Sequence, residues 1–149
     1  MLFPKIATAN IAFGSNSSGC DGTFDNVHHT INSPNYPSNY GNNELCHWRI
    51  QASPGARIQL QFETFVTERR DYIFMYDGST ESSSLLGKLS GNFGSLLSPI
   101  FSTGSQLYVI WDTDASITRS GFKIKVIAFR KYNHIKLGAY QNDGNFQNI

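Results

Sequence analysis

Apolar and polar residues alternate one by one in several short segments of this chain. Cys46, Trp48 and Ile50, for example, alternate with polar or charged neighbours. Successive side chains of a β-strand point to opposite faces of its sheet, so such a segment is predicted to form a half-buried strand. The segments predicted to form strands are 46–51, 57–62, 72–76, 107–111 and 122–129.

The connections between the predicted strands carry residues typical of tight turns. Pro54-Gly55, Asp77-Gly78 and Ser120-Gly121 are three such pairs. No helical periodicity persists over three turns, and no internal repeat is present. Strands separated by short turns predict an all-β protein, and this spacing favours an antiparallel β-sandwich.

Composition narrows the class of protein further. A chain of 149 residues, 40% of them hydrophobic, can form one domain with one core. Twelve basic residues against eleven acidic ones leave no net field that would attract nucleic acid or an anionic membrane. No stretch reaches the roughly 18 apolar residues of a transmembrane helix. Pro4 and Lys5 interrupt the weakly apolar start of the chain, which is therefore a poor signal peptide. We expect that the sequence is a fragment, a mature module or an incomplete gene model. The competing interpretation is a cytosolic protein.

The two cysteines, Cys20 and Cys46, are too few for a four-ligand metal site. They predict either one disulfide, which would close a loop of about 26 residues outside the cell, or two reduced buried thiols. Asn16 begins the glycosylation motif Asn16-Ser17-Ser18.

Motifs for catalysis are absent from the sequence, which contains no zinc-protease helix motif, no nucleophile elbow and no phosphate-binding loop. We therefore expect that this protein is not an enzyme. A transition-metal site built from His28, His29, Asp25 and His47 is disfavoured because adjacent residues of an extended segment point to opposite faces. The two tryptophans could stack on sugars, but their phase within the predicted strands favours the core. Tyrosines in the loop before the first long strand are better candidates for exposed contact, although a structural role there is the stronger prediction.

The segment Ser33-Pro34-Asn35-Tyr36-Pro37, followed by Tyr40 and then by Cys46 and Trp48, resembles the opening of a CUB domain. Further segments resemble CUB domains in the same order along the chain. They are Arg57 to Phe62 after Pro54-Gly55, Asp71-Tyr72 leading to Asp77-Gly78, Leu85 to Leu89, Trp111 to Asp114, and Ser120 to Phe122. The resemblance implies a jelly-roll-like CUB fold at 20–129, an N-terminal extension at 1–19 and a C-terminal tail or linker at 130–149.

The resemblance also implies an extracellular, secreted or cell-surface location, and it favours a disulfide between Cys20 and Cys46. CUB domains usually contain a second disulfide. The nearest positions here are Glu68 or Arg69 and Ser90, so we expect packing or charge to close that corner of the fold.

Many CUB domains bind Ca²⁺, and the resemblance implies that Glu68, Asp71 and Asp114 are its carboxylate ligands here. Ser116 and Ile117 would add backbone oxygens, and Tyr40 would support the ligands. The segment from Phe65 to Asp71 is several residues shorter than in calcium-binding relatives. The alternative is that these acids are solvated loop residues with Arg69, Arg70 or Arg119 as surface partners.

These expectations predict a non-catalytic module that recognises a lysine or arginine of an extracellular protein partner through calcium-ordered acidic loops. One alternative is a glycan- or lipid-binding module resembling spermadhesins, with exposed loop aromatics as its contacts. The other is an ancillary CUB domain of a larger protease or receptor.

Overall fold

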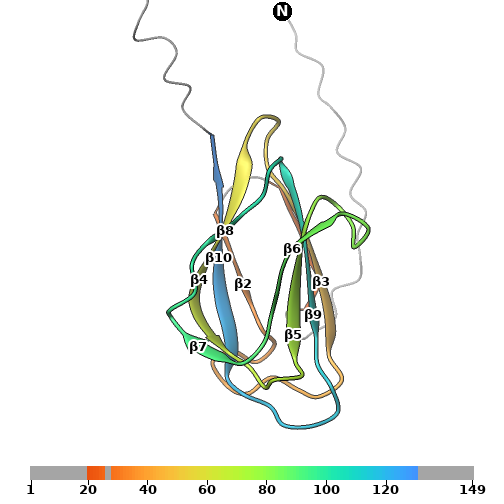
Figure 1. The fold of residues 1–149 in the computed structure, drawn as a ribbon, viewed down its shortest axis with the longest axis vertical. Helices are drawn as coiled ribbons and strands as arrows, with labels where there is room; N and C mark the ends of the chain where they lie inside the picture. The colour runs from red at the N-terminus through yellow and green to blue at the C-terminus, as the bar shows by residue number, and fades with distance from the viewer. Residues whose placement is uncertain (1–19, 26–27, 131–149) are drawn as a thin grey trace, which may run out of the picture.

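A computed structural model describes residues 20–25 and 28–130, which form two β-sheets packed face to face (Figure 1). Asn16 and nearly all of the predicted N- and C-terminal extensions lie outside the described residues. In the described part of the chain, no helix has the length and apolar character needed to cross a bilayer. The strands are β1 (Gly22–Asp25), β2 (His29–Asn32), β3 (Leu45–Gln51), β4 (Arg57–Val66), β5 (Tyr72–Asp77), β6 (Ser84–Leu89), β7 (Asn92–Gly94), β8 (Ile100–Phe101), β9 (Gln106–Asp112) and β10 (Gly121–Phe129).

The strands form sheet A, in the order β1-β3-β9-β5-β6, and sheet B, in the order β2-β10-β4-β7 with β8 also paired to β4. All recorded pairings are antiparallel except that of β1 with β3, which is parallel. The predicted antiparallel β-sandwich is therefore confirmed, and its edge contains one parallel pair. The five predicted strands correspond to β3, β4, β5, β9 and β10, which make up the middle of the two sheets.

Burial follows the predicted alternation in β3 and β4 but not in β9. In β3, Cys46, Trp48 and Ile50 are buried, whereas every residue of β9 from 107 to 111 is buried. β9 lies at the centre of sheet A, and side chains from both neighbouring strands cover its outer face. The guanidinium of Arg49 lies 5.0 Å from the ring centroid of Tyr108, for example.

The core between the sheets is built around aromatic rings. Trp48 and Trp111 are fully buried and meet the ring of Phe122 edge-on, at centroid distances of 6.1 and 5.1 Å. Phe65 stacks on the same Phe122 ring at 6.1 Å. The prediction that the tryptophans belong to the core is confirmed, so neither presents a surface for stacking on sugars.

Cys20 and Cys46 form a disulfide with an S–S distance of 1.97 Å, so the alternative of two reduced thiols is wrong. The corner that contains the second disulfide in other CUB-like sequences is closed by hydrogen bonds. Ser90 Oγ donates to the carbonyl of Arg69 at 2.9 Å. Thr67 and Gly91 are joined by two further bonds, Thr67 N to Gly91 O at 2.9 Å and Gly91 N to Thr67 Oγ1 at 2.8 Å. We expected packing or charge to close this corner; the contacts found there are hydrogen bonds made by the Ser90 hydroxyl and between Thr67 and Gly91.

We predict that reducing the disulfide lowers the free energy of unfolding by about 3 kcal/mol, because the bond removes entropy from an unfolded loop of 26 residues. Urea unfolding with and without dithiothreitol measures the difference. The Cys20→Ala/Cys46→Ala variant should match the reduced protein and ignore the reductant. Equal midpoints for the oxidised and reduced protein would contradict the prediction.

Candidate metal site

Three loops meet at one end of the sandwich, the lower end in Figure 1. The loop between β4 and β5 contains Glu68 and Asp71, the loop between β9 and β10 contains Asp114, and the loop between β2 and β3 contains Tyr40. Each loop follows or precedes a strand from the middle of a sheet. The packed core therefore fixes where the loops start and end.

The carboxylates of Glu68, Asp71 and Asp114 come together in space. Each offers one oxygen, and the three oxygens all lie within 4.8 Å of one another. Asp71 is only 1% exposed, while Glu68 and Asp114 are half-buried. Oxygens bound to one Ca²⁺ lie about 2.3 to 2.6 Å from the ion, hence up to roughly 5 Å apart, so this spacing fits a shared Ca²⁺. The short segment from Phe65 to Asp71 does not prevent Glu68 from joining the group.

The hydroxyl of Tyr40 connects two of the acidic residues. It donates a hydrogen bond to Asp71 Oδ2 at 2.6 Å and accepts one from the backbone N–H of Glu68 at 2.8 Å. The other oxygen, Asp71 Oδ1, accepts the backbone N–H of Asp114 at 2.9 Å. The carboxylate of Asp71 is thus bonded to both of the other loops.

Tyr40 is fixed from several sides. It is 2% exposed, and its ring meets that of Trp111 edge-on at 5.0 Å. Its backbone N–H donates to the carbonyl of Arg119 at 3.0 Å. Upstream of it, the turn at Ser33 is joined to β10, because Ser33 Oγ accepts the N–H of Phe122 at 3.0 Å. The structural role predicted for this tyrosine agrees with its burial, which leaves it unavailable for exposed contact.

Glycine is required next to this turn. Gly121 has a φ of 84°, in the left-handed region that side chains rarely adopt, and a Cβ at this position would collide with Ser33 Oγ. The absence of a side chain lets β10 begin directly against the proline-containing turn. Gly121 therefore contributes to the position of Tyr40 without touching the acids.

Sequence reasoning missed Glu44, which holds the loop between β2 and β3 in place. Its carboxylate accepts the backbone N–H of Gly41 at 2.8 Å and the indole N–H of Trp111 at 3.2 Å. Its backbone N–H donates to Thr113 Oγ1, and the N–H of Asn43 donates to the carbonyl of Asp114 at 2.8 Å. No local pattern marks Glu44, because its most distant partners lie on β9 and in the loop after it.

Burial and neighbouring negative charges both raise pKa values in the site. Burial raises the pKa of Asp71, the negative charges of Asp114 and Glu68 add to the increase, and the hydrogen bonds from Tyr40 and from the Asp114 backbone oppose it. The pKa of Tyr40 is raised well above its usual value, first by burial and then by its hydrogen bond to Asp71. The site concentrates negative charge that its own hydrogen bonds only partly offset.

The arginines near the site form no recorded ion pair with the acids in the described residues. Arg70 meets Glu68 through its backbone N–H, which donates to Glu68 Oε2 at 2.7 Å. A guanidinium N–H of Arg119 donates to the neighbouring carbonyl of Thr118. Among the described residues, no arginine therefore forms an ion pair with the three carboxylates.

The remaining predicted ligands lie close to Asp114 along the chain. The backbone N–H and the hydroxyl of Ser116 donate to Asp114 Oδ1 at 2.8 and 3.2 Å. Ile117 has a φ of 56° and an exposed side chain. Asp112 is exposed at the end of β9 and is not a member of the acidic group.

Two of the histidines considered above as metal ligands, His29 and His47, make other contacts. His29 packs on Phe24, with ring centroids 4.6 Å apart, and His47 Nδ1 lies 2.6 Å from the hydroxyl of Tyr108. Among the described residues, only Glu68, Asp71 and Asp114 bring three potential metal-binding side chains together.

Comparison with known proteins identifies the fold. The family model of the CUB domain matches residues 20–126. The chain belongs to the CUB domain family. CUB domains are non-catalytic interaction modules of extracellular and cell-surface proteins, so this domain is an extracellular interaction module and is not itself an enzyme.

Three relatives illustrate the match. Human tolloid-like protein 1 is 40% identical over 98 residues, which are 62% of this chain and 10% of that protein. Human tumor necrosis factor-inducible gene 6 protein is 31% identical over 121 residues, covering 78% of this chain and 43% of that protein. The crystal structure of the MASP-1 CUB2 domain bound to Ca²⁺ has a TM-score of 0.62 and 26% identity, covering 74% of this chain and 98% of that one. This CUB chain thus spans about a tenth of the length of tolloid-like protein 1.

We predict that Tyr40→Phe lowers the free energy of unfolding of the metal-free domain by about 1–3 kcal/mol. The substitution removes the partner of Asp71 Oδ2 and of the Glu68 N–H, two groups in a largely buried site. Urea unfolding in chelator measures the loss.

Tyr36→Phe is the matched control for this experiment. Tyr36 is half-buried in the same loop, and its hydroxyl makes no recorded hydrogen bond within the described residues. This control should change stability little. Equal losses in the two variants would show that the hydroxyl of Tyr40 has no special role.

Proposed function

We propose that this CUB domain binds Ca²⁺ through Glu68, Asp71 and Asp114 and uses the ordered loops to bind a lysine or arginine of an extracellular protein partner. The proposal rests chiefly on one observation, the approach of three carboxylate oxygens to within 4.8 Å of one another. The Ca²⁺-bound MASP-1 CUB2 structure, 26% identical to this chain, supports it further.

The donor set fits a hard cation. Three carboxylates supply charged oxygens, and Ca²⁺ accepts six to eight oxygen ligands in flexible geometry, so backbone oxygens of Ser116 and Ile117 and water would complete the shell. When bound, the ion would supply positive charge that offsets the repulsion among the three acids. Tyr40 would hold Asp71 in position, and the Asp114 N–H would fix the orientation of the same carboxylate.

Recognition would use the acids at the outer part of the site. Glu68 and Asp114 are half-buried, so their carboxylates remain accessible beside the deeply buried Asp71. A partner's ammonium or guanidinium group would form charge-assisted hydrogen bonds to these oxygens. Because the chain has a formal net charge of only +1, the attraction would be short-ranged and sensitive to salt.

A role as an ancillary domain of a larger protein is compatible with the same chemistry. The alignment with human tolloid-like protein 1 covers 10% of that protein, which supports a modular use of such a domain. Glycan binding through loop aromatics has less support, because Tyr40 is 2% exposed.

We predict that Ca²⁺ binding stabilises the domain by about 2.7 kcal/mol when the free ion is at one hundred times its dissociation constant. Isothermal titration calorimetry gives the affinity, and thermal unfolding gives the stabilisation. Asp114→Asn removes one of the three charges and should abolish or strongly weaken both signals. The control Asp112→Asn changes an exposed acid outside the group and should leave both signals intact.

The recognition step has a separate readout in NMR spectra of the domain. A lysine-containing peptide should shift the amide signals of residues 114–116 in Ca²⁺ but not in chelator, and the same peptide with acetylated lysine should not shift them. Absence of both heat and thermal shift at millimolar Ca²⁺ would overturn the proposal of a metal site. Normal Ca²⁺ binding with identical responses to the two peptides would overturn only the proposed recognition of a basic residue.

A further inference from the structure

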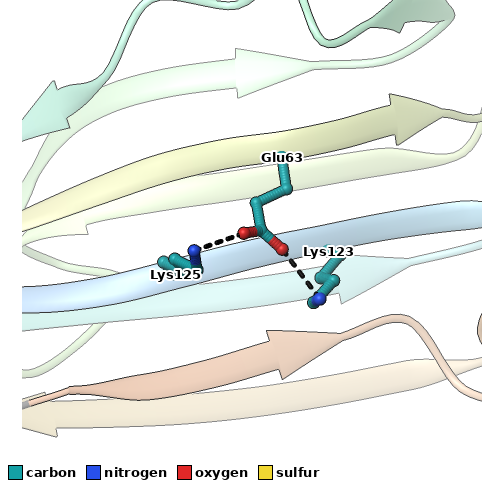
Figure 2. A network of polar contacts seen from close by, with 3 residues as sticks. All are labelled: Glu63, Lys123 and Lys125. Carbon is teal, nitrogen blue, oxygen red and sulfur yellow. Dashed lines mark ion pairs between the residues drawn. The ribbon is translucent and has the colours of Figure 1, made fainter.

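The outer face of sheet B contains two lysines that share one carboxylate. Lys123 and Lys125 lie on β10, and Glu63 lies on the neighbouring strand β4 (Figure 2). The Nζ atoms are 2.9 Å from Glu63 Oε2 and 2.6 Å from Glu63 Oε1. Side-chain exposures are 40% for Lys123, 50% for Lys125 and 27% for Glu63. The two ammonium groups are thus held next to each other in contact with solvent.

Positive charge on this face exceeds negative charge. In the strands of sheet B, all of which the structure describes, the basic residues are Arg57, Lys123 and Lys125, and the single acidic residue is Glu63. The strands of sheet A contain two basic residues and three acidic ones. Although the net charge of the chain is near zero, charged residues are unevenly distributed between the two sheets, and the strands of sheet B have a surplus of positive charge.

The lysines point outward beside polar side chains of β4 and β2. Arg57, Gln59, Gln61 and Glu63 alternate along β4 with buried apolar residues, so these four side chains share the outer face. Gln61 is in register with Lys125, and Lys125 with Thr30 of β2. Amide and hydroxyl groups thus flank the ammonium groups on both sides.

These features fit a linear polyanion better than a folded protein. Stable protein interfaces centre on buried aromatic or apolar residues, whereas the cross-strand neighbours of Lys125, Gln61 and Thr30, are polar. The apolar residues of this face, such as the contacting pair Phe101 and Phe129, lie toward the end of β10 away from Lys123. Each ammonium group has three N–H donors, and the contact with Glu63 leaves others available. Extracellular polymers that combine sulfate groups with sugar hydroxyls would match both the cations and the flanking amides.

We infer that the outer face of sheet B, through Lys123, Lys125 and Arg57, binds a sulfated polysaccharide. Sulfate groups would lie over the lysine pair, and the sugar hydroxyls would contact side chains such as Gln61 and Thr30. Glu63 would position the two lysines while weakening the attraction for an anion. The surface is formed by strands rather than by the acidic loops, so it does not depend on the proposed Ca²⁺ site.

Binding of a heparin oligosaccharide of defined length, measured by calorimetry in chelator, tests this inference. We expect Lys123→Gln/Lys125→Gln to weaken binding by about tenfold or more. Glu63→Gln should strengthen binding by about threefold, because it removes the negative charge beside the lysines and keeps the size of the side chain. A general loss of structure would not produce these opposite effects.

Lys88→Gln is the matched control for loss of a positive charge. Lys88 is an exposed lysine of sheet A, with Nζ 3.9 Å from the ring centroid of Tyr72. Its replacement should leave heparin binding unchanged. Circular dichroism of each variant confirms that the fold is retained.

Several results would overturn the inference. Unchanged affinity in the double lysine variant, or equal losses on replacing Lys88, would show that this face is not the site. Weaker binding of Glu63→Gln would contradict the role given to the glutamate. Equal affinity for polyglutamate, or for unsulfated dextran, would show that the surface is not selective for sulfated polysaccharide.

Discussion

The buried carboxylate of Asp71 joins loops that are far apart in the sequence. One of its oxygens accepts the hydroxyl of Tyr40, and the other accepts the backbone N–H of Asp114. A carboxylate that is only 1% exposed is costly to bury unless its hydrogen bonds are satisfied, and these two contacts satisfy it while joining the loops. The same carboxylate then becomes the deepest member of the acidic group. The local fold and the proposed chemistry therefore depend on one set of contacts.

Core side chains of the sandwich hold these loops in position. β9 ends and β10 begins at the same rim, and the rings of Trp111 and Phe122 pack against each other just beneath the loops. Tyr40 packs on Trp111, so a core side chain also fixes the hydroxyl that contacts Asp71. The disulfide of Cys20 with Cys46 anchors the start of the described chain to β3.

Much of the central fold was predictable, because long strands with one buried face leave a period of two in the sequence. The edge strands were not predicted. β1 and β2 have four residues each, β7 has three and β8 has two, too few for alternation to be distinguished from chance. β6 has six residues, but its burial does not alternate. β9 was predicted from its apolar residues, but its burial on both faces depends on neighbours such as Arg49 that no local pattern connects to it.

The candidate site likewise contains residues that the sequence predicted and residues that it did not. Glu68, Asp71 and Asp114 were predicted from the resemblance to CUB domains, and the structure brings them together; their role as ligands stays a prediction. Glu44 was missed because its contacts with Trp111 and Thr113 join positions nearly 70 residues apart. The lysine pair of sheet B was missed because the charge surplus exists only once β4 and β10 are adjacent.

A crystal structure determined from crystals grown in saturating Ca²⁺ tests the central claim most directly. The account predicts a single ion bonded to an oxygen from each of Glu68, Asp71 and Asp114 at about 2.3 to 2.6 Å, with the Tyr40 hydroxyl still bonded to Asp71. Water alone between these carboxylates, or an ion bound only by other residues, would contradict it.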